Sequence, residues 1–440
     1  MRPDHATPRR DLAEPPQATP VATSPGTHST RGLVSATIAT TMVVLPMFLL
    51  GGMSVLLREE LGFDEAALGI SAGSFFTTTS LVSVFGGRLA ERIGARRGMF
   101  LAMGITTAAL LSAALLARSW TTLTATMVLA GVGNGVGQPA SNLALARVVS
   151  DARQGIAFGI KQSAIPLAGL VAGITLPLIG LTLGWRWAFG LAIVGAVTVI
   201  VLTPPIPGRH AKGASPRREG DVPLGPLVVL ALGSMLGTLS ATTLGAFFVE
   251  SLVTAGVATG TAGLLLSLGS VSSIVTRLIS GWQADRREGR HLVVISIMLA
   301  IGTTGYACLA FAQSHLVVAM AGTLLAFALG WGWPGLFFMA VVKLNPNAPA
   351  VASGITLMGG AAGGMLGPAL FGLVVTRAGY STAWLCGQPS RSWDRCSCWP
   401  VDSACCAGGA AANLAIRMQE AGPPRDPERS SANRGERRRD

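Results

Sequence analysis

The sequence predicts an all-α integral membrane protein built as two six-helix bundles, with twelve expected transmembrane helices. Half of the 440 residues are hydrophobic and 12% are charged, whereas soluble proteins carry about 25% charged residues. Charge-free stretches recur that reach the ~20 apolar residues a helix needs to cross a bilayer. The two halves of the chain also repeat one another. These observations exclude a soluble enzyme, a disordered scaffold and a collagen-like fibre.

The charge-free stretches give the expected spans in chain order. Segment 291–342 holds no Asp, Glu, Lys or Arg and is long enough for two spans. An Asn-Pro-Asn sequence at 345–347 then breaks the chain before the eleventh span. The twelfth begins at Ser381 and turns polar after Leu385, so we expect it to be lost or altered. The other stretches are 33–57, 66–87, 98–117, 119–146, 162–185, 187–208, 222–249, 251–276 and about 350–376.

The segments between the spans predict the orientation and the domain limits. Residues 1–31 are rich in Pro, Thr, Ser and charge, and we expect a disordered cytoplasmic tail. With the N-terminus inside, inner segments up to residue 385 hold 18 basic residues and outer loops hold four, as the positive-inside rule requires. We therefore expect a multi-pass protein of the cytoplasmic membrane. Its further domains are the bundle 32–204, the cytoplasmic loop 205–222, the bundle 223–385 and an aberrant polar tail 386–440.

An internal repeat supports the two-bundle prediction. The sequence GRLAERIGARR at 87–97 recurs as GWQADRREGRH at 281–291, an offset of 194 residues. A Gly-x-Gly-x-Pro pattern at 135–139 recurs at 330–334, an offset of 195. Agreement at separate places within one residue indicates duplication of a six-helix unit.

The sequence GRLAERIGARR resembles the loop between the second and third spans of the major facilitator superfamily. The resemblance covers about residues 33–385 and implies a secondary transporter whose loop latches the cytoplasmic ends of the bundles together in the outward-open state. It assigns Glu91 as a gating residue, which we expect to pair with Arg92 or Arg96 and to face a helix N-terminus; the alternative is that the arginines only set topology. The second-half copy is weaker. The gating candidates are Gly87, Glu91, Arg92, Gly94, Arg96, Arg97, Gly281, Asp285 and Arg286.

Two basic residues lie at membrane depth. Lys161 is one to two turns inside the fifth span and Arg277 about two turns from the inner end of the eighth. Each would cost about 2.5–3.5 kcal/mol facing lipid at mid-bilayer. They therefore face a central cavity or extend to the inner headgroups. The segment GIKQSAIPLAG at 159–169 is similar to spans of anion and cyanate-type permeases, and two cations without a central carboxylate favour an anionic or electron-rich substrate.

Polar and aromatic residues supply further cavity candidates. Asn134, Gln138, Ser141 and Asn142 follow one another at helical spacing in the fourth span, so this stripe lines either the cavity or a helix contact. Trp331 and Trp333 occupy the corresponding place in the second half, where they bound the substrate or only pack.

Glycine and proline clusters predict close packing and bending in two spans. The eleventh span resembles the Gly-Pro hinge motif of drug antiporters, although that motif belongs to the fifth span there. The helix-hinge candidates are Pro166, Gly169, Gly173, Gly364, Gly367 and Pro368.

The expected function is uptake of a small anionic or polar compound by alternating access. The alternatives are an antiporter that exports drugs or metabolites, and a membrane sensor or scaffold without transport. No His/Cys/Asp cluster, phosphate loop or nucleophile elbow is present in the sequence, so we expect neither an enzyme nor a metal or cofactor. The 33 basic residues form short clusters between apolar runs, which does not indicate nucleic-acid binding. We expect a monomer in the lipid bilayer with a small-molecule substrate, and leave the coupling ion open.

Five of the six cysteines lie within segment 386–406. They lack the spacing of zinc ligands and have no nearby His. The repeat places the twelfth span at about 382–399, which contains three charged residues that oppose membrane insertion. Our hypothesis is a reading-frame shift near Cys386.

Overall fold

The computed structural model describes residues 25–148, 159–204, 224–286, 291–311, 315–345 and 349–386. Every regular element in these ranges is helical. Ten helical segments are long and apolar enough to cross a membrane. Helix α5 adds another segment of 29 residues, whose Asn and Gln residues lower its hydropathy. The helical segments follow the order that the sequence predicts.

The N-terminal bundle contains the first six segments. The fifth consists of residues 159–163, α7, the π-helical turn η2 and α8, and the sixth of α9 and α10. The elements are α1 (Pro25–Gly52), α2 (Ser54–Leu61), α3 (Glu65–Ile93), α4 (Ala95–Leu116), α5 (Trp120–Val148), α7 (Ala164–Thr175), η2 (Leu176–Gly180), α8 (Leu181–Leu183), α9 (Trp185–Gly190) and α10 (Ala192–Leu202).

The C-terminal bundle contains the remaining segments. Its fourth segment is interrupted: α14 runs into the π-helical turn η4, and a turn at 331–333 precedes α15. The elements are α11 (Leu224–Thr254), α12 (Thr259–Arg286), α13 (His291–Ala310), α14 (Leu316–Leu325), η4 (Ala326–Gly330), α15 (Pro334–Leu344) and α16 (Pro349–Cys386).

The expected limit of the N-terminal tail is wrong. Helix α1 begins at Pro25, inside the segment 1–31 that we expected to be disordered. Proline suits the first turn of a helix because its φ is already helical and its missing N–H would be unpaired there. The helix therefore begins about two turns before its apolar part, whereas the segment able to cross a membrane begins at Thr30. Residues 1–24 and the loop 205–222 lie outside the described residues.

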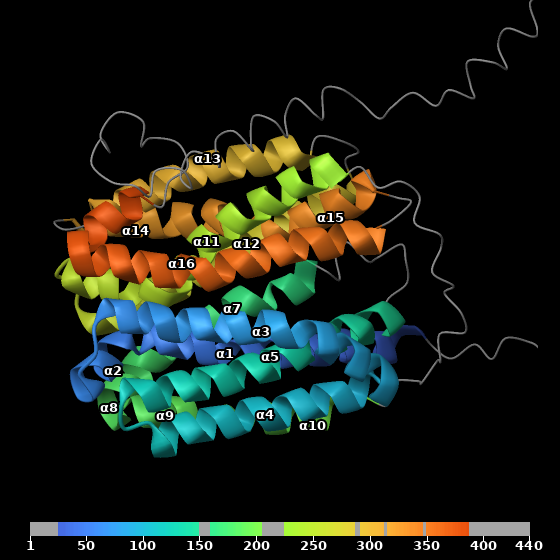
Figure 1. Cartoon of the computed structure of the whole chain (residues 1–440), viewed down its shortest axis with the longest axis horizontal. Helices are drawn as coiled ribbons and strands as arrows, with labels where there is room; N and C mark the ends of the chain where they lie inside the picture. Colours follow the sequence, from blue (N-terminus) through green and yellow to red (C-terminus); the bar gives the residue numbers. More distant parts are fainter. Residues whose placement is uncertain are drawn as a thin grey trace, which may run out of the picture.

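The two bundles lie one above the other in Figure 1, with α7 between them. At the end of the molecule that carries α2, backbones from the two bundles touch. A Cβ on Gly69 of α3 would stand 2.3 Å from the carbonyl oxygen of Pro368 in α16. A Cβ on Gly51 of α1 would stand 1.9 Å from the carbonyl oxygen of Gly245 in α11. Only glycine permits this approach, so small residues hold the bundles together at the α2 end.

Toward the opposite end the same faces separate. Met365 contacts Gly73 of α3. Met358 lies two helical turns away on the same face of α16, and it is 74% exposed. On α3, Val84 is 61% exposed. The described conformation is therefore closed at the α2 end and open at the end that carries the α3–α4 loop.

Helix α16 changes direction at Gly379, whose φ of 76° interrupts the helical conformation. The eleventh span ends there, and 380–386 form the start of the expected twelfth. Trp384 in this short segment is 1% exposed and its ring centroid lies 4.6 Å from that of Phe371. Residues 387–440, on which the altered twelfth span and the frame-shift hypothesis depend, lie outside the described residues.

Candidate functional site

Lys161 is a buried cation held by two amide oxygens. It lies in the helical residues just before α7 and is 3% exposed. Its Nζ donates to Oε1 of Gln138 at 2.8 Å and to Oδ1 of Asn142 at 2.6 Å. Gln138 and Asn142 are four residues apart on α5 and share one face. Among the described residues, Lys161 forms no ion pair with a carboxylate, so its charge is solvated but not neutralised.

Arg277 of α12 is a second buried cation, 1% exposed. Its Nη1 donates to the carbonyl oxygen of Gln162 at 2.7 Å, and its Nη2 donates to that of Trp331 at 2.8 Å. Gln162 belongs to the N-terminal bundle, whereas Trp331 belongs to the C-terminal bundle. The planar guanidinium therefore connects the two bundles. Its Nε is buried and has no partner among the described residues.

Both carbonyl oxygens can accept from Arg277 because the helices that carry them are interrupted and supply no backbone N–H to them. The helical donor for Gln162 would be residue 166, and Pro166 has no N–H. Trp331 follows the π-helical turn η4 with φ −123° and ψ −2°, and α15 begins only at Pro334. Interrupted spans in transporters commonly expose such backbone groups near a ligand site. Pro166, a hinge candidate, thus supplies Arg277 with an acceptor.

Aromatic rings cover this region from both bundles. The Trp331 ring stacks on Phe48 of α1, with centroids 5.5 Å apart and planes inclined by 27°. The Arg277 guanidinium carbon lies 5.8 Å from the centroid of the Trp331 ring. Trp333 points elsewhere: it packs against Phe337 and against Gly237 of α11. The structure therefore brings Trp331, but not Trp333, to Arg277.

The polar stripe of α5 divides into two parts. Gln138 and Asn142 bind Lys161, as described above. Asn134 donates to Oγ1 of Thr79 in α3 at 3.2 Å, and Ser141 accepts from Oγ1 of Thr40 in α1 at 3.0 Å. Asn134 and Ser141 thus mediate helix contacts inside the N-terminal bundle.

The α3–α4 loop lies at the open end. Glu91, Arg92 and Arg96 are exposed, and no ion pair joins Glu91 to either arginine among the described residues. The expected pairing is therefore absent in this conformation, where Arg96 instead covers the ring of Phe100 at 4.9 Å. Gly94 ends α3 with φ 88° and so turns the chain into α4.

The close helix approach expected of Gly87 belongs to its neighbour. A Cβ on Gly86 would stand 2.4 Å from the carbonyl oxygen of Gly135, whereas one on Gly87 would reach only the Pro139 side chain at 3.8 Å. Arg88 and Arg97, two further basic residues of the loop motif at 87–97, are also exposed. In the second half Gly281 is buried, and the side chains of Asp285 and Arg286 lie outside the description.

The remaining hinge candidates lie at tight helix contacts. A Cβ on Gly169 would meet Oγ of Ser270 at 2.6 Å, and one on Gly173 would meet the carbonyl oxygen of Gly263 at 2.5 Å, so α7 and α12 touch across the bundles. A Cβ on Gly367 would meet the Leu239 carbonyl oxygen at 2.6 Å, and one on Gly364 the Phe76 ring at 3.1 Å. Pro368 lies inside α16, whose helical conformation is interrupted at Gly379.

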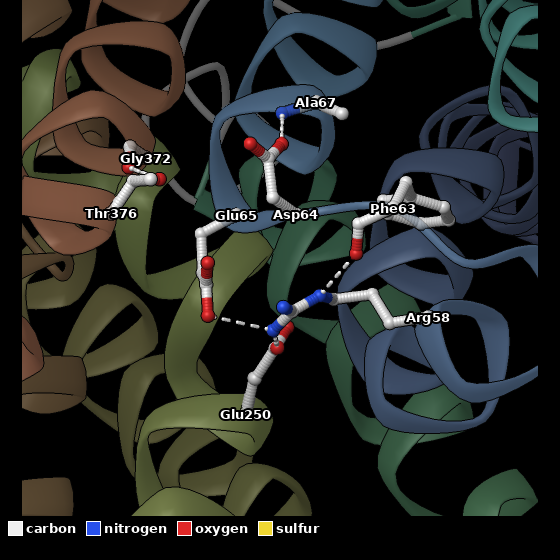
Figure 2. A network of polar contacts seen from close by, with 8 residues as sticks. All are labelled: Arg58, Phe63, Asp64, Glu65, Ala67, Glu250, Gly372 and Thr376. Atoms are coloured by element: carbon white, nitrogen blue, oxygen red, sulfur yellow. Dashed lines mark hydrogen bonds and ion pairs between the residues drawn. The ribbon is translucent and has the colours of Figure 1, made fainter.

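An ion-pair network at the closed α2 end was not predicted from the sequence (Figure 2). Nη1 of Arg58 in α2 contacts Oε1 of Glu65 in α3 at 2.9 Å and also Oε1 of Glu250 in α11. Nε of Arg58 donates to the carbonyl oxygen of Phe63 at 2.9 Å. The sequence offered two signals: Glu250 is a carboxylate at the end of an apolar span, and Arg58 is a basic residue among acidic ones. They are 192 residues apart, so no local pattern paired them.

No cluster of three or more His, Cys, Asp or Glu side chains suited to a metal ion occurs within the described ranges. The geometry consists of two buried cations, amide oxygens and an aromatic wall between two bundles. Residues 36–368 match the family model of the Major Facilitator Superfamily. The chain belongs to this superfamily. It is therefore a membrane transporter and not an enzyme.

Three proteins named as transporters or as an efflux pump are similar to this chain. A gentisate transporter of Corynebacterium glutamicum is 25% identical over 344 residues, covering 74% of this chain and 76% of the relative. An efflux pump of Mycolicibacterium smegmatis is 27% identical, covering 72% and 78%. A protein of Agrobacterium vitis named for tartrate transport is 23% identical, covering 76% and 81%.

Solved structures of superfamily members share the fold. A bacterial homologue of the lysosomal transporter Spinster, in an inward-facing and occupied conformation, has a TM-score of 0.61 at 15% identity; the match covers 89% of this chain and 96% of the homologue. A nucleoside transporter has a TM-score of 0.65 at 16% identity, covering 88% and 99%.

Proposed function

We propose that this superfamily member takes up a small organic carboxylate by alternating access of its two bundles. One observation carries the proposal: Arg277 is buried at the seam between the bundles, Lys161 is buried against α5 next to the Gln162 that binds Arg277, and no carboxylate of the described residues pairs with either cation. An anion that binds there gains charge-assisted hydrogen bonds in a region of low dielectric constant. The acceptors that now solvate the cations are neutral, so an anionic ligand can compete with them.

The site also supports a ligand with a planar ring and hydroxyl groups. Trp331 and Phe48 provide a flat apolar wall from both bundles. Ser270 and Ser273 precede Arg277 on one face of α12, and each has a buried hydroxyl without a partner among the described residues. Two of the similar proteins are named for gentisate and tartrate, which are both hydroxylated carboxylates.

The proposed orientation places the α2 end outside. The exposed arginines of the α3–α4 loop then face the cytoplasm, in agreement with the positive-inside rule. The described conformation, closed at the α2 end and open at the loop end, is then inward-facing. The loop latch would form only when the cytoplasmic ends approach each other, which is consistent with the absence of a Glu91 ion pair here.

Uptake into proteoliposomes tests this function. Purified protein is reconstituted and the entry of labelled gentisate, of tartrate and of the uncharged gentisyl alcohol is measured. We expect entry of at least one carboxylate, no entry of the alcohol, and a loss of tenfold or more in Lys161→Met, because an isolated charge-assisted hydrogen bond contributes about 1.5–3 kcal/mol. Lys343→Met is the matched control, since Lys343 is exposed on α15. Carboxylate uptake by Lys161→Met at the wild-type rate would contradict the proposed site.

Efflux is the second candidate, because a similar protein is named as an efflux pump. It predicts that expression confers resistance to apolar compounds and that Lys161→Met leaves this resistance unchanged.

A further inference from the structure

Arg58 stands between two carboxylates that belong to different bundles (Figure 2). Glu65 begins α3 in the same bundle as Arg58, whereas Glu250 lies in a buried stretch of α11 in the opposite bundle. The Arg58–Glu250 pair is therefore a polar link across the seam at the closed end. Separation of the bundles at this end requires the link to break.

The Glu250 carboxylate is poorly stabilised as an anion. Its side chain is 5% exposed. Oε1 contacts Arg58, but Oε2 is buried and has no hydrogen-bond partner among the described residues. A buried carboxylate oxygen without a donor costs free energy that a proton on that oxygen would remove. Glu250 also lines a surface hollow of about 540 Å³, together with Arg58, Glu59 and Asp64, so water can reach the site.

The charges around Glu250 also favour a proton. Arg58 contributes one positive charge, and Glu65 and Glu250 contribute two negative charges, which leaves the triad at −1. Glu59 of α2 adds negative charge, as does Asp64, whose carboxylate accepts from the backbone N–H of Ala67 at 2.8 Å. From α16, Tyr380 interacts electrostatically with Glu65 and Arg58. Arg377, one turn before Tyr380, adds a positive charge that opposes this trend. One added proton brings the triad to neutrality.

We propose that Glu250 is a proton-binding site that controls opening of the outer side. A proton from the outside water binds Oε2 of Glu250. The neutral carboxyl group no longer attracts Arg58, which keeps Glu65 as its partner, and the charged link across the seam is lost. The protonated protein is then biased toward the outward-open conformation. The proposal depends on the orientation given under Proposed function, but not on the identity of the substrate.

Distance measurements between spin labels test the proposal without any substrate. Labels are attached at Thr121→Cys and Ala258→Cys, two exposed positions at the α2 end, in a full-length chain whose native cysteines are replaced by serine. The distance distribution is recorded in proteoliposomes from about pH 8 to about pH 4.5, a range that covers carboxyl titration. We expect the population with the longer distance to grow severalfold as the pH falls.

The variants identify the responsible group. Glu250→Gln mimics the protonated carboxyl group, so its longer-distance population should be high and independent of pH. Glu65→Gln keeps the cross-seam pair of Arg58 with Glu250, so it should keep a pH response, displaced to lower pH because the triad loses a negative charge that favours the proton. Replacement of Na⁺ by K⁺ at constant pH should change nothing.

Three outcomes would overturn the proposal: a wild-type distribution that ignores pH, a Glu250→Gln protein with the wild-type pH response, or a distribution that follows Na⁺. If Glu250→Gln cannot be purified, Arg58→Gln provides the second test, because it removes the same link and should also favour the longer distance. Failure of these measurements leaves carboxylate uptake unaffected, since that function is tested by flux alone.

Discussion

The guanidinium of Arg277 donates to the carbonyl oxygen of Gln162 at 2.7 Å, across the seam between the two bundles. This carbonyl is available because Pro166, four residues later, has no N–H to donate. A proline in one bundle thus determines where an arginine of the other bundle binds.

Replacement of Arg277 should therefore destabilise the protein. Arg277→Met leaves two buried carbonyl oxygens without donors, and each should cost about 1–3 kcal/mol of unfolding free energy. Arg277→Lys should recover only part of this loss. Its ammonium group can donate to a carbonyl oxygen, but it lacks the planar fork that reaches both oxygens. Denaturant titration in detergent micelles measures the difference. Arg118→Met, at an exposed position, serves as the control; an Arg277→Met protein as stable as the control would refute the cross-seam role.

Gln138 and Asn134 should respond differently to replacement although both belong to the polar stripe of α5. Gln138→Leu leaves Lys161 with Asn142 as its one acceptor among the described residues, so its ammonium group is no longer held in position for the ligand, and we expect carboxylate uptake to fall tenfold or more. Asn134→Leu removes a contact with Thr79 inside one bundle and should change uptake less than twofold, at a cost of about 1 kcal/mol in stability. Parallel measurements of uptake and unfolding distinguish the two effects. Equal losses of uptake would show that the whole stripe lines the cavity.

Gly69→Ala should favour the outward-open conformation. The added Cβ would stand 2.3 Å from the Pro368 carbonyl oxygen, so α3 and α16 can no longer approach each other at the closed end. The spin-label pair on Thr121 and Ala258 should report a larger population with the longer distance. Gly104→Ala is the control, because a Cβ there meets no atom within 4 Å and helix propensity alone favours alanine by about 1 kcal/mol. A Gly69→Ala distribution identical to that of the control would contradict this prediction.

The short helix after Gly379 should be essential to the C-terminal bundle, whereas the tail should not. Trp384→Ala empties a buried site beside Phe371 and Tyr306, and should cost about 3–5 kcal/mol. Deletion of residues 391–440 should leave the melting temperature and the yield unchanged if these residues do not belong to the fold. A large loss of stability on deletion would show that the tail contributes to it.

The order and limits of most membrane-length helices could be predicted from the sequence because each span is a local property of about 20 residues. Charge-free runs, the repeat and the loop motif each depend on neighbouring positions, and α5 was found although its polar stripe lowers its hydropathy. The limit of α1 was wrong because helices extend past apolar segments when a proline can start them.

The candidate site could be predicted only in part. Lys161 and Arg277 were recognisable because a charge in an apolar helix is costly wherever it points. Their partners were not, since helical spacing gives the face of a residue and not the helix that covers it. The separation of Trp331 from Trp333 depends on the turn after η4, which no local pattern indicated. The ion pairs of Arg58 with Glu65 and Glu250 could not be predicted, because no local pattern shows which loops meet at the α2 end.

In the alternating-access cycle proposed above, the position of Arg58 between Glu65 and Glu250 has a consequence for the speed of transport. When the outer ends part, the arginine exchanges two counter-ions for one and so is never left without a carboxylate partner. The electrostatic work of opening is then smaller than that of separating an isolated ion pair. An arrangement of this kind lowers the barrier between conformations while leaving the closed form well defined, so the same residue can hold the outer side shut and release it quickly.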